Sequence, residues 1–137
     1  MGLEAPAYGA WLAHASIANV GGTVKWYFVY RKGGVNVNLT DTIGPSLDTW
    51  YSIEVYVRVS ATVGEVRLYI NGDLRLSDSG FDNSDAGSVG AFRVGERGSN
   101  GQTAHDTYVD CVVAADAYIG PEAGGQQLFT LINELNY

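Results

Sequence analysis

The chain is short of cysteine, basic residues and long apolar runs, and each shortage excludes a class of protein. Cys111 is the only cysteine, so no disulfide framework can form within the chain, and its valine neighbours favour a place in the core. Eight Lys and Arg against 15 Asp and Glu give a net charge of −7, which would repel nucleic acid. No apolar run approaches the roughly 18 residues of a membrane span, and no apolar stretch follows Met1. We expect neither membrane insertion nor a signal peptide in this sequence.

Glycine and aromatic residues are plentiful, and their placement is typical of an all-β protein. The chain has 18 Gly and 9 Tyr in 137 residues, enough for one domain with a single core. The glycines lie in pairs or beside asparagine, between runs in which apolar and polar residues alternate. Asn71-Gly72, for example, can supply the positive φ angles of a type I′ hairpin turn.

The alternating runs predict about eight strands, a number that builds an antiparallel two-sheet jelly-roll-like sandwich. In several runs one set of side chains is apolar and faces the predicted core, while the other set is polar or aromatic and faces outward. The runs span residues 8–20, 23–31, 35–40, 50–59, 65–71, 73–77, 89–96 and 107–120. The predicted core contains Ile53, Val55, Val57, Val66, Leu68, Ile70, Phe92, Val94, Val109 and Cys111.

The C-terminal segment follows a different pattern. Its apolar residues recur at the i, i+3, i+4 and i+7 spacing of a helix, and a helix of about three turns must dock to be stable. We therefore expect a sandwich domain at residues 1–121, followed at 122–137 by a Gly-containing linker and a short C-terminal helix or docking segment. Docking across a subunit boundary is favoured over docking within the chain. The apolar positions of this tail are Leu128, Leu131, Ile132 and Leu135.

An ordered set of motifs resembles the second half of a concanavalin A-like lectin/glucanase, or laminin G-like, jelly-roll domain. The motifs are "TWYSIEVYVRVS", a turn ending at Gly64, "EVRLYINGDL" and "FRVGERGSNGQTAHDTYVDCVV". The resemblance covers Tyr8 to Pro121. Members usually carry several strands before the position equivalent to Tyr8, so the resemblance implies that a neighbouring chain or the tail supplies missing partners.

The polar face of the 50–59 and 65–71 strands is the predicted binding surface. Aromatic rings stack on sugar C–H groups, and charged side chains beside them bind hydroxyls, so this face favours carbohydrate. A solvated sheet face with ordinary cross-strand pairs is the alternative. The candidate ligand-binding residues are Glu54, Tyr56, Arg58, Arg67 and Tyr69, with Tyr27 joining from an earlier strand.

Catalysis is not expected. Glycoside hydrolases of the resembled fold carry a Glu-x-Asp-x-x-Glu triplet that supplies paired carboxylates, and the chain contains no such triplet. Calcium is a candidate cofactor, because Asp82, Asn83 and Asp85 offer oxygen ligands in the loop "DNSDAG". By the resemblance, Asp110 matches a final-strand aspartate that helps to hold a structural calcium. Turn formation is the competing reason for these loop residues.

The sequence thus predicts a non-catalytic recognition module for carbohydrate or a cell-surface glycan, a lectin-like part of an extracellular or cell-surface protein. An alternative is a structural or assembly subunit of the fibre, capsid or phage-tail type. Such a subunit would form homo-oligomers through an exposed sheet edge and the C-terminal tail. A truncated glycoside hydrolase is a third, weaker interpretation.

Overall fold

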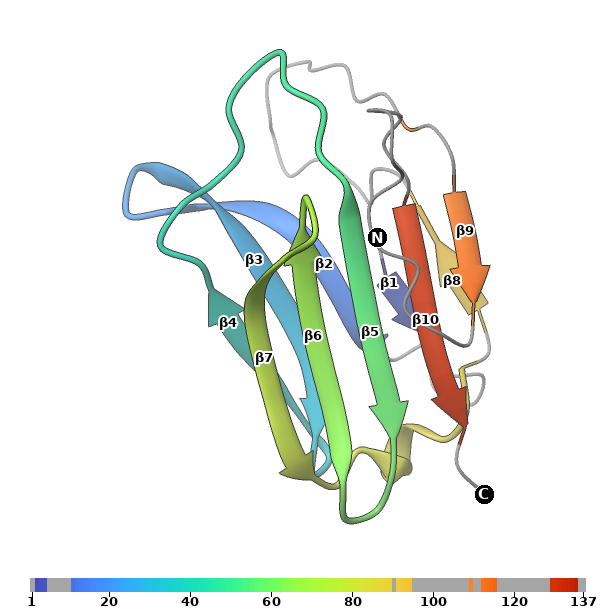
Figure 1. Ribbon diagram of the computed structural model, residues 1–137. Helices are drawn as coiled ribbons and strands as arrows, with labels where there is room; N and C mark the ends of the chain where they lie inside the picture. The colour runs from blue at the N-terminus through green and yellow to red at the C-terminus, as the bar shows by residue number, and fades with distance from the viewer. Residues whose placement is uncertain are drawn as a thin grey trace.

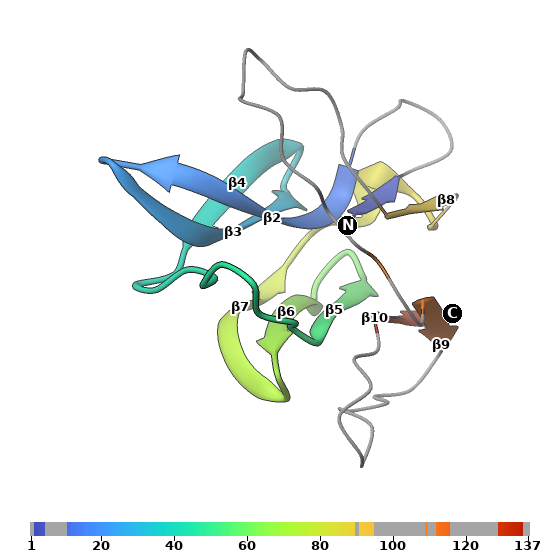
Figure 2. The same ribbon diagram turned by 90° about the horizontal axis from the view of Figure 1, so that it is seen from above.

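The structure of the chain, a computed structural model, is a two-sheet β-sandwich (Figure 1). The all-β sandwich predicted from the sequence is confirmed. Seen from above, the two sheets form two layers (Figure 2). No helix among the described residues is long and apolar enough to cross a membrane. The structure describes residues 2–4, 11–89, 91–94, 109, 112–115 and 129–135, with side chains for all of these except 2–4, 92 and 129–135.

Within the residues that the structure describes, each sheet has five strands. The first sheet has the order β4-β3-β2-β1-β8 and the second has the order β7-β6-β5-β10-β9. The first comprises β1 (Gly2–Glu4), β2 (Trp11–Val20), β3 (Thr23–Lys32), β4 (Val35–Thr40) and β8 (Ala91–Arg93). The second comprises β5 (Ile53–Val59), β6 (Gly64–Ile70), β7 (Asp73–Phe81), β9 (Val112–Ala115) and β10 (Phe129–Leu135), and the 3-10 turn η1 (Ser84–Ala86) follows β7.

Tight turns join the antiparallel strands, and the sequence explains them. Asn71 and Gly72 have φ angles of 54° and 82°, the positive values that a type I′ turn requires. The predicted Asn-Gly turn is therefore confirmed. Gly33 and Gly34, at 54° and 80°, close the β3–β4 hairpin in the same way. Because two-residue turns of this type match the right-handed twist of the strands, they also fix the register of each hairpin.

Large aromatic side chains from one sheet meet aliphatic side chains from the other in the core. Phe28 and Tyr30 of β3 are buried, and their register partners on β2 are Ala15 and Ala13. Small residues beside large rings let one layer interlock with the next at native packing density. Residues buried in this core include Trp26, Phe28, Tyr30, Val55, Val57, Val66, Leu68, Ile70 and Phe81.

The predicted core is confirmed for β5 and β6 and wrong at one position further along the chain. Ile53 is half-buried and packs against the core, and Val94 is half-buried. Val109 is 40% exposed because it lies outside any strand, so the alternation that placed it in the core does not apply there. The side chains of Phe92 and Cys111 lie outside the described ones. The confirmed members are Val55, Val57, Val66, Leu68 and Ile70.

Within the predicted tail, Phe129–Leu135 forms the strand β10, so the short helix is not shown and these residues dock as a strand. β10 lies between β5 and β9 and pairs parallel with both, so the sheet is not wholly antiparallel. The spacing of Phe129, Leu131 and Leu135 fits a strand as well as a helix, and periodicity alone does not separate the two in so short a segment. Hydrogen bonding to the otherwise free edge of β5 decides between them. The docking shown by the structure is within the chain.

Two asparagines secure the ends of β5. At one end Ser52 donates its N–H to Asn71 Oδ1 at 2.9 Å, and Asn71 donates its N–H to the Ser52 carbonyl at 2.8 Å. At the other end Ser60 and Asn83 repeat this pair of bonds at 2.8 and 3.1 Å. The Asn83 amide also donates to the Arg58 carbonyl. Side-chain amides thus continue the hydrogen-bonding pattern where the strand itself ends.

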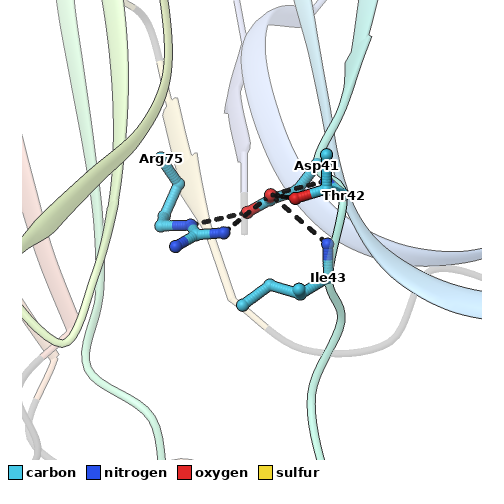
Figure 3. Close-up of polar contacts among 4 residues, drawn as sticks. All are labelled: Asp41, Thr42, Ile43 and Arg75. Carbon is cyan, nitrogen blue, oxygen red and sulfur yellow. Dashed lines mark hydrogen bonds and ion pairs between the residues drawn. The ribbon is translucent and has the colours of Figure 1, made fainter.

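An ion pair joins the two sheets where β4 lies beside β7. The Arg75 guanidinium donates to Asp41 through Nε at 2.7 Å and Nη2 at 2.8 Å, in the two-bond geometry drawn in Figure 3. Asp41 directly follows the last residue of β4. Arg75 is the extra residue at a bulge in β7, since Leu68 pairs with Leu76 and Tyr69 with Leu74. The bulge places an arginine where a regular strand would not.

Candidate functional site

Three cross-strand pairs form the candidate site on the outer face of the second sheet. Glu54 lies opposite Tyr69, Tyr56 opposite Arg67, and Arg58 opposite Glu65. These residues alternate along β5 and β6 with buried core residues, so all six occupy the face that turns away from the first sheet. We call this set the β5–β6 outer face. The structure thus brings together five of the six residues predicted to bind a ligand.

Arg67 is the centre of the β5–β6 outer face. Its Nε donates to Glu65 Oε1 at 2.7 Å, and Nη2 lies 2.6 Å from the same oxygen. Nη1 donates to the Tyr69 hydroxyl at 3.3 Å, and the guanidinium carbon lies 5.0 Å from the centroid of the Tyr56 ring. The hydrogen bonds with Tyr69 and Glu65 raise the pKa of Arg67. Arg67 is therefore a cation held in one orientation by three neighbours.

Burial divides the face into a covered part and an accessible part. Glu54 is 3% exposed and Tyr56 is 9% exposed, so neither offers much surface to a ligand. Tyr69 is half-buried, and its register partner on β7 is Leu74, which is 52% exposed. Arg67 keeps 39% of its side chain exposed. The accessible part is therefore centred on Arg67, Tyr69 and Leu74, and Tyr56 supports Arg67 from beneath.

Tyr27 does not belong to this face. It lies on β3 between the buried core residues Trp26 and Phe28, so its side chain turns to the outer face of the first sheet. The two outer faces are on opposite sides of the sandwich. The prediction that Tyr27 joins the other candidates on one surface is wrong, because the sequence does not state which sheet receives each hairpin.

The predicted calcium ligands in the described residues have other partners. Asn83 is fully buried and its amide is engaged by Ser60 and Arg58, as described above. Asp82 accepts hydrogen bonds from the N–H and the hydroxyl of Ser84, which also lower its pKa.

The third loop candidate, Asp85, pairs with Arg31 at 3.0 Å. No group of three or more His, Cys, Asp or Glu side chains suited to a metal occurs among the described residues. Turn formation and an ion pair thus account for the contacts of Asp82 and Asp85, and calcium binding at this loop stays a prediction. Asp110 lies outside the described residues.

Two members of the site went unrecognised as candidates in the sequence. Glu65 lies on the same face as Arg67 and Tyr69 by simple alternation, so its position two residues before Arg67 was a usable signal. Leu74 joins Tyr69 only because the bulge at Arg75 shifts the register of β7. No local sequence pattern predicts that bulge, so the position of Leu74 beside Tyr69 could not be predicted from the sequence.

Comparisons of the chain with protein-family models, curated proteins and solved structures gave no match. The resemblance to concanavalin A-like and laminin G-like domains therefore stays a prediction. The β5–β6 outer face and its neighbour Leu74 on β7 are the surface on which a ligand could bind.

Proposed function

We propose that the protein is a non-catalytic recognition module that binds carbohydrate or a cell-surface glycan through the accessible part of the β5–β6 outer face. It would serve as a module of an extracellular or cell-surface protein. The observation that carries the proposal is the fixed guanidinium of Arg67 beside the half-buried Tyr69 ring. A sugar presents C–H groups on one side and hydroxyls around its edge, and this pair offers a partner for each.

Pre-organisation supports this proposal. Glu65, Tyr69 and the Tyr56 ring already hold Arg67, so a ligand would not have to order a long, flexible side chain. Leu74 adds an exposed apolar edge beside Tyr69. Such a surface suits a flat, weakly bound ligand better than a deep, tightly bound one.

The arrangement of the carboxylates favours binding over hydrolysis. Glu65 lies opposite Arg58, and Glu54 lies four positions from Arg58 along β5. At roughly 3.3 Å per residue the two glutamates start from backbone positions about 13 Å apart along the strands. Paired catalytic carboxyl groups of glycoside hydrolases are separated by roughly 5 to 9.5 Å, which these two glutamates would reach only if both side chains leaned towards each other along the strands. Glu65 is moreover held by Arg67, and Glu54 is buried.

A glycan array followed by titration of the best ligand tests the proposal. Tyr69→Ala removes the stacking ring, and we expect it to weaken binding at least tenfold, a loss of about 1.4 kcal/mol. Tyr56→Leu removes the ring beneath Arg67, and we expect a smaller loss because the guanidinium becomes less well ordered. Both variants should keep the circular dichroism spectrum of the wild-type protein.

Tyr27→Ala is the matched control, because it removes a half-buried tyrosine from the outer face of the other sheet. It should leave glycan binding unchanged. An array without a bound glycan would reject the proposal. Equal losses in Tyr69→Ala and Tyr27→Ala would show that any bound glycan does not use the β5–β6 outer face.

A further inference from the structure

The four sheet edges in the described part of the chain differ in how they are protected. The edges are β4 and β8 in the first sheet and β7 and β9 in the second. β8 and β9 are three and four residues long, and short edges offer little to a new strand. β7 is nine residues long but has two register shifts and the charged residues Asp73, Arg75 and Asp78. Bulges and charges are the usual means of preventing edge-to-edge pairing.

β4 has none of these protections. Its six residues, "VNVNLT", contain no charge and no proline, and they pair with β3 in an unbroken register from Val35 to Thr40. The strand lies at the margin of the first sheet in Figure 1. A regular, uncharged edge strand is a template for another strand.

The free hydrogen-bonding groups of β4 can be assigned from the hairpin. The Gly33-Gly34 turn closes on the Lys32–Val35 pair, so alternate residues starting with Val35 point their N–H and C=O groups towards β3. The hydrogen bond from the Asp41 N–H to the Trp26 carbonyl at 2.9 Å continues this alternation. The groups that point outward therefore belong to Asn36, Asn38 and Thr40, whose side chains are all exposed.

β4 is complementary to itself in one antiparallel register. If Asn38 of one copy lies opposite Asn38 of another, then Asn36 lies opposite Thr40, and all three outward-pointing residues of each copy find partners. In the same register Val37 lies opposite Leu39 on the inner face. Polar residues thus meet polar residues outside and apolar residues meet apolar ones inside, which is the matching that specifies register.

Charge also favours this edge as the contact between copies. Each copy carries a net charge of −7, so most of its surface repels another copy. From Gly33 to Thr40 the chain is uncharged. The charged residues at its two ends, Arg31, Lys32 and Asp41, are paired with Asp85, Asp78 and Arg75 respectively. Two copies meeting at β4 bring little negative charge together, and added salt should screen the remaining long-range repulsion.

We propose that two copies of this chain associate by antiparallel pairing of their β4 strands about a two-fold axis centred on Asn38. The first sheets of the two copies then form one continuous sheet. A single six-residue strand per copy makes an interface smaller than the roughly 1,600 Å² of stable complexes, so the dimer is weak and depends on concentration. This self-association is independent of glycan binding, which uses the other sheet.

Sedimentation equilibrium over a wide concentration range measures the association. We expect the average mass to rise from 14.6 kDa towards twice that value as the protein concentration increases. Added salt should lower the protein concentration at which the dimer forms. Asn38→Lys places two cations opposite each other at the two-fold axis and should weaken dimerisation at least tenfold. Ser79→Lys adds the same charge to an exposed position on β7 and should leave dimerisation unchanged.

Cross-linking tests the register directly. In a Cys111→Ser background, Asn38→Cys should form a disulfide-linked dimer on mild oxidation, because directly opposed residues bring their Cα atoms to roughly 5.5 Å. Ser79→Cys in the same background should not. A protein that stays monomeric up to about 1 mM overturns the proposal. A dimer that Asn38→Lys does not weaken, or that Ser79→Lys weakens equally, overturns the assignment to β4.

Discussion

Removing the guanidinium of Arg75 should destabilise the sandwich, because Arg75 joins the two sheets through Asp41. The Asp41 carboxylate is 5% exposed and the Arg75 side chain is 28% exposed. Besides its two bonds from Arg75, Asp41 accepts hydrogen bonds from the N–H groups of Thr42 at 2.6 Å and Ile43 at 3.4 Å (Figure 3). In Arg75→Met the carboxylate stays nearly buried but loses its counter-charge.

The structure sets the size of the expected effect. Removing one partner of a fully buried ion pair costs about 3 to 5 kcal/mol, whereas exposed pairs contribute less than about 1 kcal/mol. The Asp41–Arg75 pair lies between these limits, and two backbone N–H groups continue to stabilise the carboxylate. We expect Arg75→Met to lower the free energy of unfolding by about 2 kcal/mol, which is a fall of about 7 °C in Tm for a chain of this size.

Acid unfolding supplies a second, independent readout of the same pair. The hydrogen bond from Arg75 is the main cause that lowers the pKa of Asp41, and burial acts in the opposite direction. A carboxyl whose folded-state pKa is lowered stabilises the fold above its unfolded-state pKa, about 3.9, and this stabilisation is lost as the pH falls through the folded-state pKa. In Arg75→Met the pKa of Asp41 should rise, so the midpoint of acid unfolding should move to higher pH.

Urea denaturation of Arg75→Met, Asp41→Asn and the double variant measures the coupling between the two side chains. The double variant should lose less stability than the sum of the single variants, because each single change leaves the other group without its partner. Lys25→Met, which removes a positive charge from the outer face of β3, is the control for net charge and should change stability little. A loss below about 0.5 kcal/mol in Arg75→Met, with no coupling, would refute the reasoning.

Three further changes test other contacts. Asn83→Ala leaves the Ser60 N–H and the Arg58 carbonyl without this partner, so it should lower the free energy of unfolding, measured in urea, by about 3 kcal/mol. Asn38→Ala, at an exposed site, is the control and should change it by less than about 0.5 kcal/mol. Gly44→Ala should displace the loop and speed hydrogen exchange at the Trp26 amide, which donates to the Ile43 carbonyl, because a Cβ at position 44 would clash with the Val24 carbonyl oxygen. Unchanged exchange would contradict this packing. Burial and the hydrogen bond to Asp78 raise the pKa of Tyr30. The stability that Tyr30 contributes is therefore present below the ordinary tyrosine pKa and is lost as the pH rises through the higher folded-state pKa. Asp78→Asn should let Tyr30 ionise at lower pH in a spectrophotometric titration.

The β5–β6 hairpin could be predicted from the sequence because its determinants are local. Alternation separated Val55 and Val57 from Glu54 and Tyr56 correctly, so the pairs on the outer face followed from the strand pattern. The turn at Asn71-Gly72 could also be predicted, because these two residue types favour positive φ angles. Alternation does not predict how exposed a side chain is. Tyr56 is 9% exposed and Arg67 lies over its ring, a contact that depends on how long side chains pack.

Long-range pairing was the part of the fold that the sequence did not reveal. β10 is far from β5 in the chain, and it forms a strand because an edge of the second sheet needs a partner. Its apolar spacing suited a helix equally well, so tertiary hydrogen bonding decided the outcome. The assignment of Tyr27 failed for a related reason, because strand patterns show which side chains share a face but not which strands share a sheet.

The edge strands β4 and β7 show that the protection of a sheet edge against pairing depends on contacts in the folded protein. The bulge in β7 delivers Arg75 to Asp41, so one irregularity both protects the edge of the second sheet and fastens the end of β4. The same contact holds the end of β4 in place but does not protect β4 against pairing with another strand, since Asp41 lies beyond its last residue. A rigid, uncharged edge loses less conformational entropy on pairing than a mobile one, so the Asp41–Arg75 contact should favour pairing at β4. Arg75→Met should therefore weaken the proposed dimer as well as the fold, even though Arg75 lies on the other sheet and outside the paired strands.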